Sequence, residues 1–176
     1  MTQIADNRIL RITKLLVYLI MGFVAGGGVV LALVSVGLPL YWNEALAEIA
    51  KEKPGIDTSS LLPGLLAIFA LGILVLGLLW TMMRKLLTII DSVEDGNPFI
   101  KANAVRLRAI GWMMVALQIV GLPLATAAGN VADLFGENDV GFDLPLNGIL
   151  AILLTFILAG IFERGAEMRE ELEGTV

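Results

Sequence analysis

The stretch that decides the fold covers residues 15–41 and reads LLVYLIMGFVAGGGVVLALVSVGLPLY, with no charged side chain among its 27 residues. As a helix that rises 1.5 Å per residue it would be about 40 Å long, which exceeds the roughly 30 Å hydrocarbon core of a bilayer. A secretory signal peptide has an apolar region of only about 7–15 residues. The stretch therefore predicts an uncleaved membrane helix that tilts, bends or projects from the membrane.

Three more uncharged apolar runs of membrane-spanning length follow, over residues 61–83, 110–128 and 144–162. The composition agrees with four spans. Hydrophobic residues make up 57% of the chain and charged residues only 16%, whereas about 25% is usual for soluble domains. The sequence predicts an all-α fold, an integral membrane four-helix bundle, with residues 1–176 forming a single domain.

Lysine and arginine positions predict the orientation of these spans, because cytoplasmic loops are enriched in both residues. Ten of the twelve lie in the two terminal tails and in the loop between the second and third spans, and the other two are Lys51 and Lys53. We expect both termini and this second loop to be cytoplasmic, in a multi-pass membrane protein. In the first loop, Trp42, Leu46 and Ile49 share one face of a short expected helix that suits the outer membrane surface.

Two helices are expected to continue past the membrane into the cytoplasm. Apolar residues recur at three- and four-residue spacing after the second span, so its helix should end near Gly96, a residue suited to the C′ position. Asn97 could then cap the next helix, with Pro98 in its first turn. The fourth helix should extend through the acidic residues 163–173 and stop at Gly174.

The residues that most catalytic chemistry requires are missing. The chain has no cysteine and no histidine, and its net charge is −5. It therefore lacks thiol nucleophiles and the commonest general base and metal ligand, and direct nucleic-acid binding is disfavoured. The sequence shows no catalytic constellation, metal-ligand spacing or cofactor motif, so we expect a protein that is not an enzyme and that has no cofactor and no metal.

Gly22 and Gly26 form a GxxxG pattern within the first span. Small residues at this spacing let membrane helices approach one another closely. We expect these glycines to pack against a helix of the same chain, and a homo-oligomer contact through them is the alternative.

Two stretches carry a family resemblance: EDGNPFIKANAVRLRAIGW over residues 94–112 and FERGAEMREELEGTV over residues 162–176. They resemble the second loop and the acidic C-terminus of a bacterial family of small four-helix membrane proteins of unknown function. Members of that family are commonly paired with a small helix-turn-helix transcriptional regulator, so the resemblance implies a membrane anchor or sensor that binds or regulates such a cytoplasmic partner. The residues that the resemblance assigns to partner binding are Gly96, Asn97, Pro98, Phe99, Asn103, Arg106, Arg108, Trp112, Glu163, Glu167 and Glu170.

The alternative function is transport of a small solute or a lipid-like molecule by a homo-oligomer, since apolar cargo requires no buried charge. For either function, antiparallel packing brings the start of the third helix and the end of the fourth to the same side of the membrane. We expect Arg106 and Arg108 to meet the glutamates of the C-terminal tail there, with Phe99 packed beneath the charges. Anionic lipid is the alternative occupant of the arginines.

Overall fold

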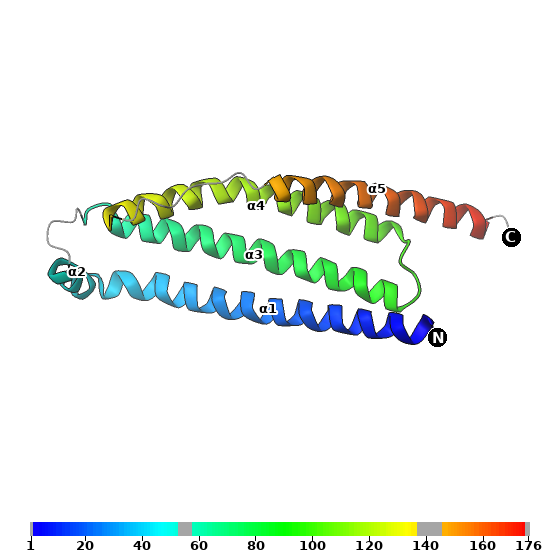
Figure 1. Ribbon diagram of the computed structural model, residues 1–176, viewed down its shortest axis with the longest axis horizontal. Coiled ribbons are helices and arrows are strands. Elements are labelled where there is room, and N and C mark those ends of the chain that lie inside the picture. Colours follow the sequence, from blue (N-terminus) through cyan, green and yellow to red (C-terminus); the bar gives the residue numbers. More distant parts are fainter. Residues whose placement is uncertain (1, 53–57, 137–145, 175–176) are drawn as a thin grey trace. The chain divides into compact units, whose positions relative to one another are not determined.

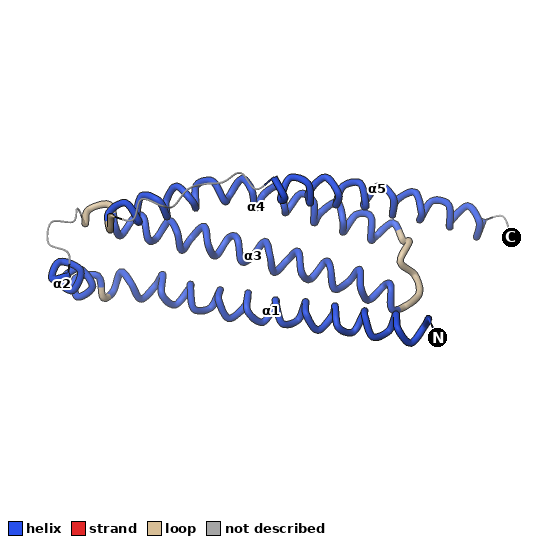
Figure 2. Tube along the Cα trace, viewed as in Figure 1, coloured by secondary structure: helices blue, strands red, loops and turns tan. Residues whose placement is uncertain are grey.

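The computed structural model describes residues 2–52, 58–136 and 146–174 (Figure 1). Within these ranges the chain forms helices and no strand (Figure 2). In chain order the helices are α1 (Thr2–Leu40), α2 (Trp42–Glu52), α3 (Leu61–Glu94), α4 (Lys101–Leu134) and α5 (Leu146–Gly174). The expected all-α fold is confirmed.

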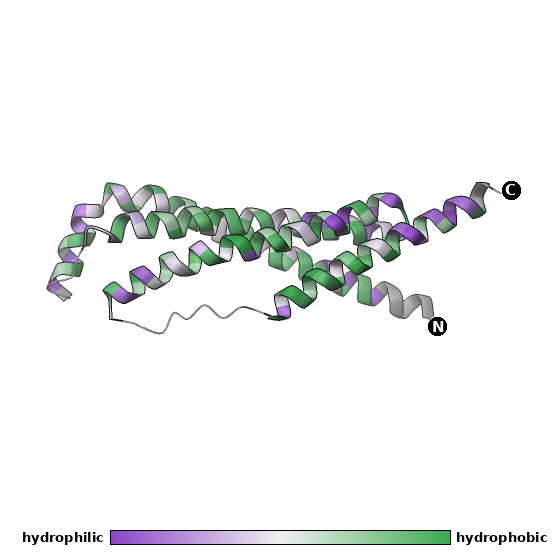
Figure 3. Cartoon of the chain, turned by 90° about the horizontal axis from the view of Figure 1, so that it is seen from above, coloured by the Kyte–Doolittle hydropathy of each residue, from purple (hydrophilic) through white to green (hydrophobic). Residues whose placement is uncertain are grey.

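Four of these helices are long and apolar enough to cross a membrane. They cover Arg8–Leu40, Leu61–Glu94, Lys101–Leu134 and Leu146–Leu172, with mean hydropathies between 1.7 and 2.6. In the most apolar part of each helix only 6% to 11% of the residues are buried within the protein, and Figure 3 shows hydrophobic residues along most of their length. Exposing such surface to water costs about 25 cal/mol per Å². These helices therefore require lipid around them, and the chain is a multi-pass membrane protein.

The chain divides into two compact units, each assembled from separate stretches. The first unit comprises Met1–Val24, Leu78–Ala116 and Pro145–Val176, and the second comprises Ala25–Gly77 and Leu117–Leu144. Because α1, α3 and α4 each contribute residues to both units, the units do not follow the chain as successive domains would, and the single domain stays a prediction.

Two hydrophobic clusters form the core of the first unit. One joins α1 to α3 and consists of Val17, Met21, Leu87 and Ile90. The other joins α3, α4 and α5 and consists of Ile89, Leu107, Ile110 and Ala159. Since Ile89 and Ile90 are adjacent in α3, this helix packs on two sides and is central to the unit. All the site residues that the sequence predicted belong to this unit.

In the second unit, glycines of α3 allow the close approach of neighbouring helices. A Cβ atom on Gly72 would lie 2.8 Å from Cδ2 of Leu31 in α1, and one on Gly64 would lie 2.9 Å from Cγ2 of Val131 in α4. Both distances are too short for a side chain larger than hydrogen without a shift. Small residues therefore bring helices together in this membrane protein, but they are glycines of α3 rather than the GxxxG pair of α1.

Gly22 and Gly26 do not pack within the chain. A Cβ atom added at either position would meet no other atom within 4 Å. The buried face of α1 in the first unit instead carries Val17, Met21 and Val24. Successive residues of a helix are rotated by about 100°, so the glycines turn away from this face. The expectation of packing within the chain is wrong for Gly22 and Gly26, whereas a Cβ atom on Gly27 or Gly28 would lie 3.9 Å from Cδ1 of Leu76 in α3. A homo-oligomer contact through Gly22 and Gly26 stays a prediction.

The end of α3 agrees with the sequence. Gly96 has a φ of 76°, and its N–H donates to the carbonyl of Val93 at 3.1 Å while the N–H of Asn97 donates to the carbonyl of Ser92 at 2.9 Å. This pair of bonds is a Schellman motif with Gly96 at C′. The extensions of α3 to Glu94 and of α5 to Gly174 are likewise confirmed, whereas residues 144 and 145 of the fourth predicted span lie outside the described ranges.

The start of α4 differs from the expectation that Asn97 caps the helix and Pro98 lies in its first turn. The helix begins at Lys101, and residues 97–100 form a loop that ends where the N–H of Asn103 donates to the carbonyl of Ile100 at 2.9 Å. Proline disfavours helical geometry in the residue before it. The side chain of Asn97 is also engaged elsewhere, as described below, so it does not cap α4.

The short helix expected in the first loop is present as α2. Its residues Trp42, Leu46 and Ile49 are half-buried, and Asn43, between them in sequence, is exposed. The amphipathic character that the sequence predicted is therefore confirmed, and its position on the outer membrane surface stays a prediction.

Candidate functional site

The most tightly built polar feature of the first unit is the buried side chain of Asn103, which has no exposed surface. Its Nδ2 donates to Oγ of Ser92 at 2.5 Å and to the carbonyl of Pro98 at 2.8 Å, and its Oδ1 accepts from Nη1 of Arg106 at 2.6 Å. The hydroxyl of Ser92 donates in turn to the carbonyl of Ile89 at 2.6 Å. Both amide protons and the amide oxygen of Asn103 are thus bonded. The network ties the end of α3, the loop and the first turn of α4 together.

An aromatic contact attaches the same loop to α5. The ring of Phe99 lies 5.1 Å from that of Phe162, centroid to centroid, with the planes inclined by 45°, a separation at which aromatic pairs attract. Gly165 makes room for it, because a Cβ atom at that position would lie 2.7 Å from Cδ1 of Phe99. Ala166 beside it is buried. The expected apolar contact of Phe99 with the tail is confirmed, but Phe99 remains 42% exposed and is therefore not packed beneath the charges.

Three polar contacts surround this anchor. Nζ of Lys101 lies 2.6 Å from Oε2 of Glu170, and Nη2 of Arg108 lies 2.8 Å from Oε2 of Glu163. Nη1 of Arg169 donates to Oδ1 of Asn97 at 2.7 Å. The ion-paired side chains are about half exposed, and pairs of that kind contribute about 0–1 kcal/mol each. These contacts position the loop and the start of α4 against α5, but they add little to the free energy of unfolding.

The predicted contact between the loop region and the acidic tail is therefore confirmed. Arg108 meets a glutamate of the tail as expected, but Arg106 does not. Glu163 pairs with Arg108, and Glu170 with Lys101; Glu167 acts electrostatically on the Lys101 ammonium. The expectation that Arg106 meets these glutamates is wrong. Arg106 and Arg108 are two residues apart, which places them about 200° apart around α4, so Arg106 turns toward α3.

Of the other predicted site residues, Gly96, Asn97, Pro98 and Asn103 are brought together with Phe99 by the contacts above. Trp112 lies three turns beyond the start of α4, where its ring, 63% exposed, meets the edge of Phe156 at 5.6 Å. We call residues 96–101 together with residues 162–170 of α5 the loop–tail surface; the predicted site residues Asn103, Arg106, Arg108 and Trp112 of α4 lie outside it.

Several residues of this region were not anticipated from the sequence. Ser92 completes the Asn103 network, and Gly165 accommodates the Phe99 ring. Lys14 of α1 pairs with Asp91 at 2.7 Å and with Glu94 at 2.8 Å, which joins α1 to the end of α3. In the sequence, Lys14 counts only among the cations of the N-terminal tail that predict the orientation. It lies about 80 residues before Asp91 and Glu94, and no local pattern predicts a pair over that separation.

Across residues 2–52, 58–136 and 146–174, no group of three or more histidine, cysteine, aspartate or glutamate side chains is placed to hold a metal ion. The contacts described above hold the loop against the charged helix α5.

Four long apolar helices and a polar surface at the ends of α3, α4 and α5 define a helical multi-pass membrane protein. Residues 44–176 match the family described as "Protein of unknown function (DUF2975)", and the chain belongs to that family. The matched segment contains α3, α4, α5 and the whole loop–tail surface. Searches of curated proteins and of solved structures found no significant match.

Proposed function

We propose that this protein is a non-enzymatic anchor or sensor of the bacterial inner membrane, with both termini in the cytoplasm. Its loop–tail surface binds a soluble cytoplasmic partner, and a small helix-turn-helix transcriptional regulator is the partner class that fits. The support is the loop itself, which is held in one conformation by the Asn103 network and by the contact of Phe99 with α5. A connecting loop has no need of such fixation, whereas a binding surface gains from it, because less conformational entropy is lost on association.

The chemistry of the surface supports a protein partner. Phe99 and Met168 are 42% and 60% exposed, and aromatic and methionine side chains are enriched in protein interfaces. A cavity of about 230 Å³ lies between the loop and α5, lined by Asn97, Phe99, Ile100, Lys101, Ala166, Arg169 and Glu170. It is large enough to receive a partner side chain.

The charge of the C-terminal end of α5 favours a basic partner. The loop–tail surface itself carries three acidic and three basic side chains, and Glu163 and Glu170 are already paired, so the excess of acidic charge lies in residues 167–173. The sequence from 163 to 173 contains five glutamates and two arginines, and Glu167 is exposed. Proteins that bind DNA present lysine- and arginine-rich faces to the phosphate backbone. An acidic helix complements such a face, and a regulator held through it could not bind DNA with the same face.

The test is affinity capture with the full-length protein in detergent, followed by binding measurements with the purified captured protein. Met168→Arg should weaken binding at least tenfold, because it places a charge on the exposed apolar part of the surface, while Met168→Leu should bind like the wild type. Recovery of no soluble protein by the wild type, or equal binding by both variants, contradicts the proposed function.

A further inference from the structure

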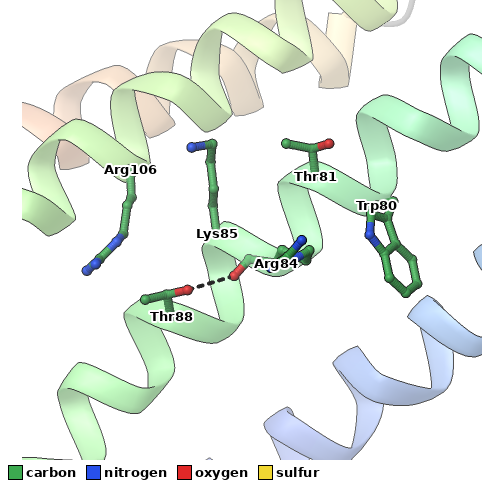
Figure 4. Close-up of a pocket in the computed structure, with 6 residues that line it drawn as sticks. All are labelled: Trp80, Thr81, Arg84, Lys85, Thr88 and Arg106. Carbon is green, nitrogen blue, oxygen red and sulfur yellow. Dashed lines mark hydrogen bonds between the residues drawn. The ribbon is translucent and has the colours of Figure 1, made fainter.

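A second cavity, of about 330 Å³, lies between α3 and α4 on the side of α4 that Arg106 faces (Figure 4). Its lining consists of Trp80, Thr81, Arg84, Lys85, Thr88 and Arg106. In Figure 4 Lys85 extends from α3 toward α4, and Arg106 extends from α4 into the same space. Three of the six lining side chains are cations, and none is an anion.

The positive charge of this cavity is not neutralised within the described part of the chain. Lys14, Lys51, Lys101 and Arg108 form ion pairs elsewhere, but no described carboxylate forms an ion pair with Arg84, Lys85 or Arg106. Arg106 donates instead to the neutral amide oxygen of Asn103, which orients the guanidinium without cancelling its charge. Cations that line the same cavity repel one another, and an anion bound among them relieves this repulsion, so the cavity is suited to an anionic ligand.

The position of the cavity indicates the kind of anion. Arg84 follows directly on the uncharged run 61–83, where a membrane-spanning helix reaches the level of the lipid headgroups. Trp80 lies one helical turn earlier and is 37% exposed, as is typical of tryptophan at the interface of membrane and water. A guanidinium group can donate two parallel hydrogen bonds to two oxygens of one phosphate. Basic pockets between membrane helices bind anionic lipid headgroups.

We infer that this cavity binds the phosphate of an anionic phospholipid, between Arg84 and Lys85 of α3 and Arg106 of α4. The phosphate accepts hydrogen bonds from the three cations, and the glycerol and acyl chains leave along the Trp80 side. The inference depends on the membrane location of α3 and not on any protein partner, so it stands or falls separately from the proposed function.

The experiment measures phosphatidylglycerol and phosphatidylcholine binding to the full-length protein in detergent by native mass spectrometry. The test variant carries Arg84→Gln with Lys85→Gln, which leaves the Asn103 network intact. The matched control carries Arg8→Gln with Arg11→Gln, which removes the same charge from exposed positions of α1 outside the cavity. At about fivefold per cation, phosphatidylglycerol binding should fall about twentyfold in the test variant and by less than about threefold in the control.

Three results would overturn the inference. The first is equal binding of phosphatidylglycerol and phosphatidylcholine by the wild type. The second is an equal loss in the test and control variants, which would show a diffuse effect of charge. The third is displacement of the lipid by inorganic phosphate at about the concentration of a bacterial cytoplasm, which would assign the cavity to free phosphate. Circular dichroism of both variants shows that any loss of binding occurs in a folded protein.

Discussion

Replacing Asn103 by alanine tests whether one buried amide holds the loop between α3 and α4 in place. The substitution removes two hydrogen bonds to neutral partners, Ser92 and Pro98, and one from the Arg106 guanidinium. The neutral bonds contribute about 1 kcal/mol each and the charged one about 1.5–3 kcal/mol. Arg106 is only half-buried and can turn to water, so the expected destabilisation of the closed loop is about 3 kcal/mol.

Hydrogen–deuterium exchange measures this loss directly. The amides of Gly96, Asn97 and Asn103 all donate to backbone carbonyls of the folded loop. Loss of about 3 kcal/mol should speed their exchange by about a hundredfold. Ser92→Ala is the matched control, because it removes only one of the three bonds of the Asn103 side chain, together with the bond of Ser92 to Ile89 within α3. It should speed exchange of the loop amides by only about fivefold. Exchange in Asn103→Ala within twofold of the wild type would refute the claim that this residue holds the loop.

Two further sets of glycine-to-alanine substitutions test how closely the helices pack at glycines. Gly165→Ala places a methyl group 2.7 Å from the Phe99 ring, so it should lower the free energy of unfolding by about 1–3 kcal/mol and displace the loop. Gly160→Ala in the same helix, where a Cβ atom meets nothing within 4 Å, should leave thermal unfolding in detergent unchanged or slightly raised, and an equal loss in both variants would contradict the fit of the ring over Gly165. Gly22→Ala with Gly26→Ala should leave the folded monomer unaffected, since both positions are open within the chain. Light scattering of the purified protein then decides their role: a lost oligomer supports a homo-oligomer contact, and an unchanged mass argues against one.

The membrane helices follow from the sequence because their signal is physical and long. A run of about 20 apolar residues has few stable solutions other than a spanning helix. The runs over 61–83 and 110–128 lie within such helices, and so does the run over 15–41 except for its last residue, Tyr41. The ends of helices outside the membrane are harder to predict from the sequence, because no long apolar run marks them. Gly96 at the end of α3 was predictable because its φ of 76° suits glycine. The start of α1 at Thr2 was not, since no apolar pattern marks residues 2–14.

The candidate site shows which contacts the spacing of residues along the sequence does not predict. The charges that bring the loop and tail together were visible in the sequence, and so was the apolar anchor Phe99. Which arginine faces α5 depends on the rotation of α4 about its axis, and a difference of two residues sends Arg106 and Arg108 to opposite sides. Asn97 was a reasonable helix cap by residue type, but its contact with Arg169 depends on a helix more than 70 residues away in sequence. Tertiary contacts of this kind leave no local pattern.

The proposed function requires the loop–tail surface to face the cytoplasm, and cysteine labelling tests this most directly. The chain has no native cysteine, so each introduced thiol reports alone. Met168→Cys lies on the loop–tail surface, and Ala47→Cys lies at an exposed position of α2. In intact cells a membrane-impermeant maleimide should label Ala47→Cys and should reach Met168→Cys only after the membrane is permeabilised. Labelling of Met168→Cys in intact cells, with Ala47→Cys protected, would reverse the orientation and contradict a cytoplasmic partner at this surface.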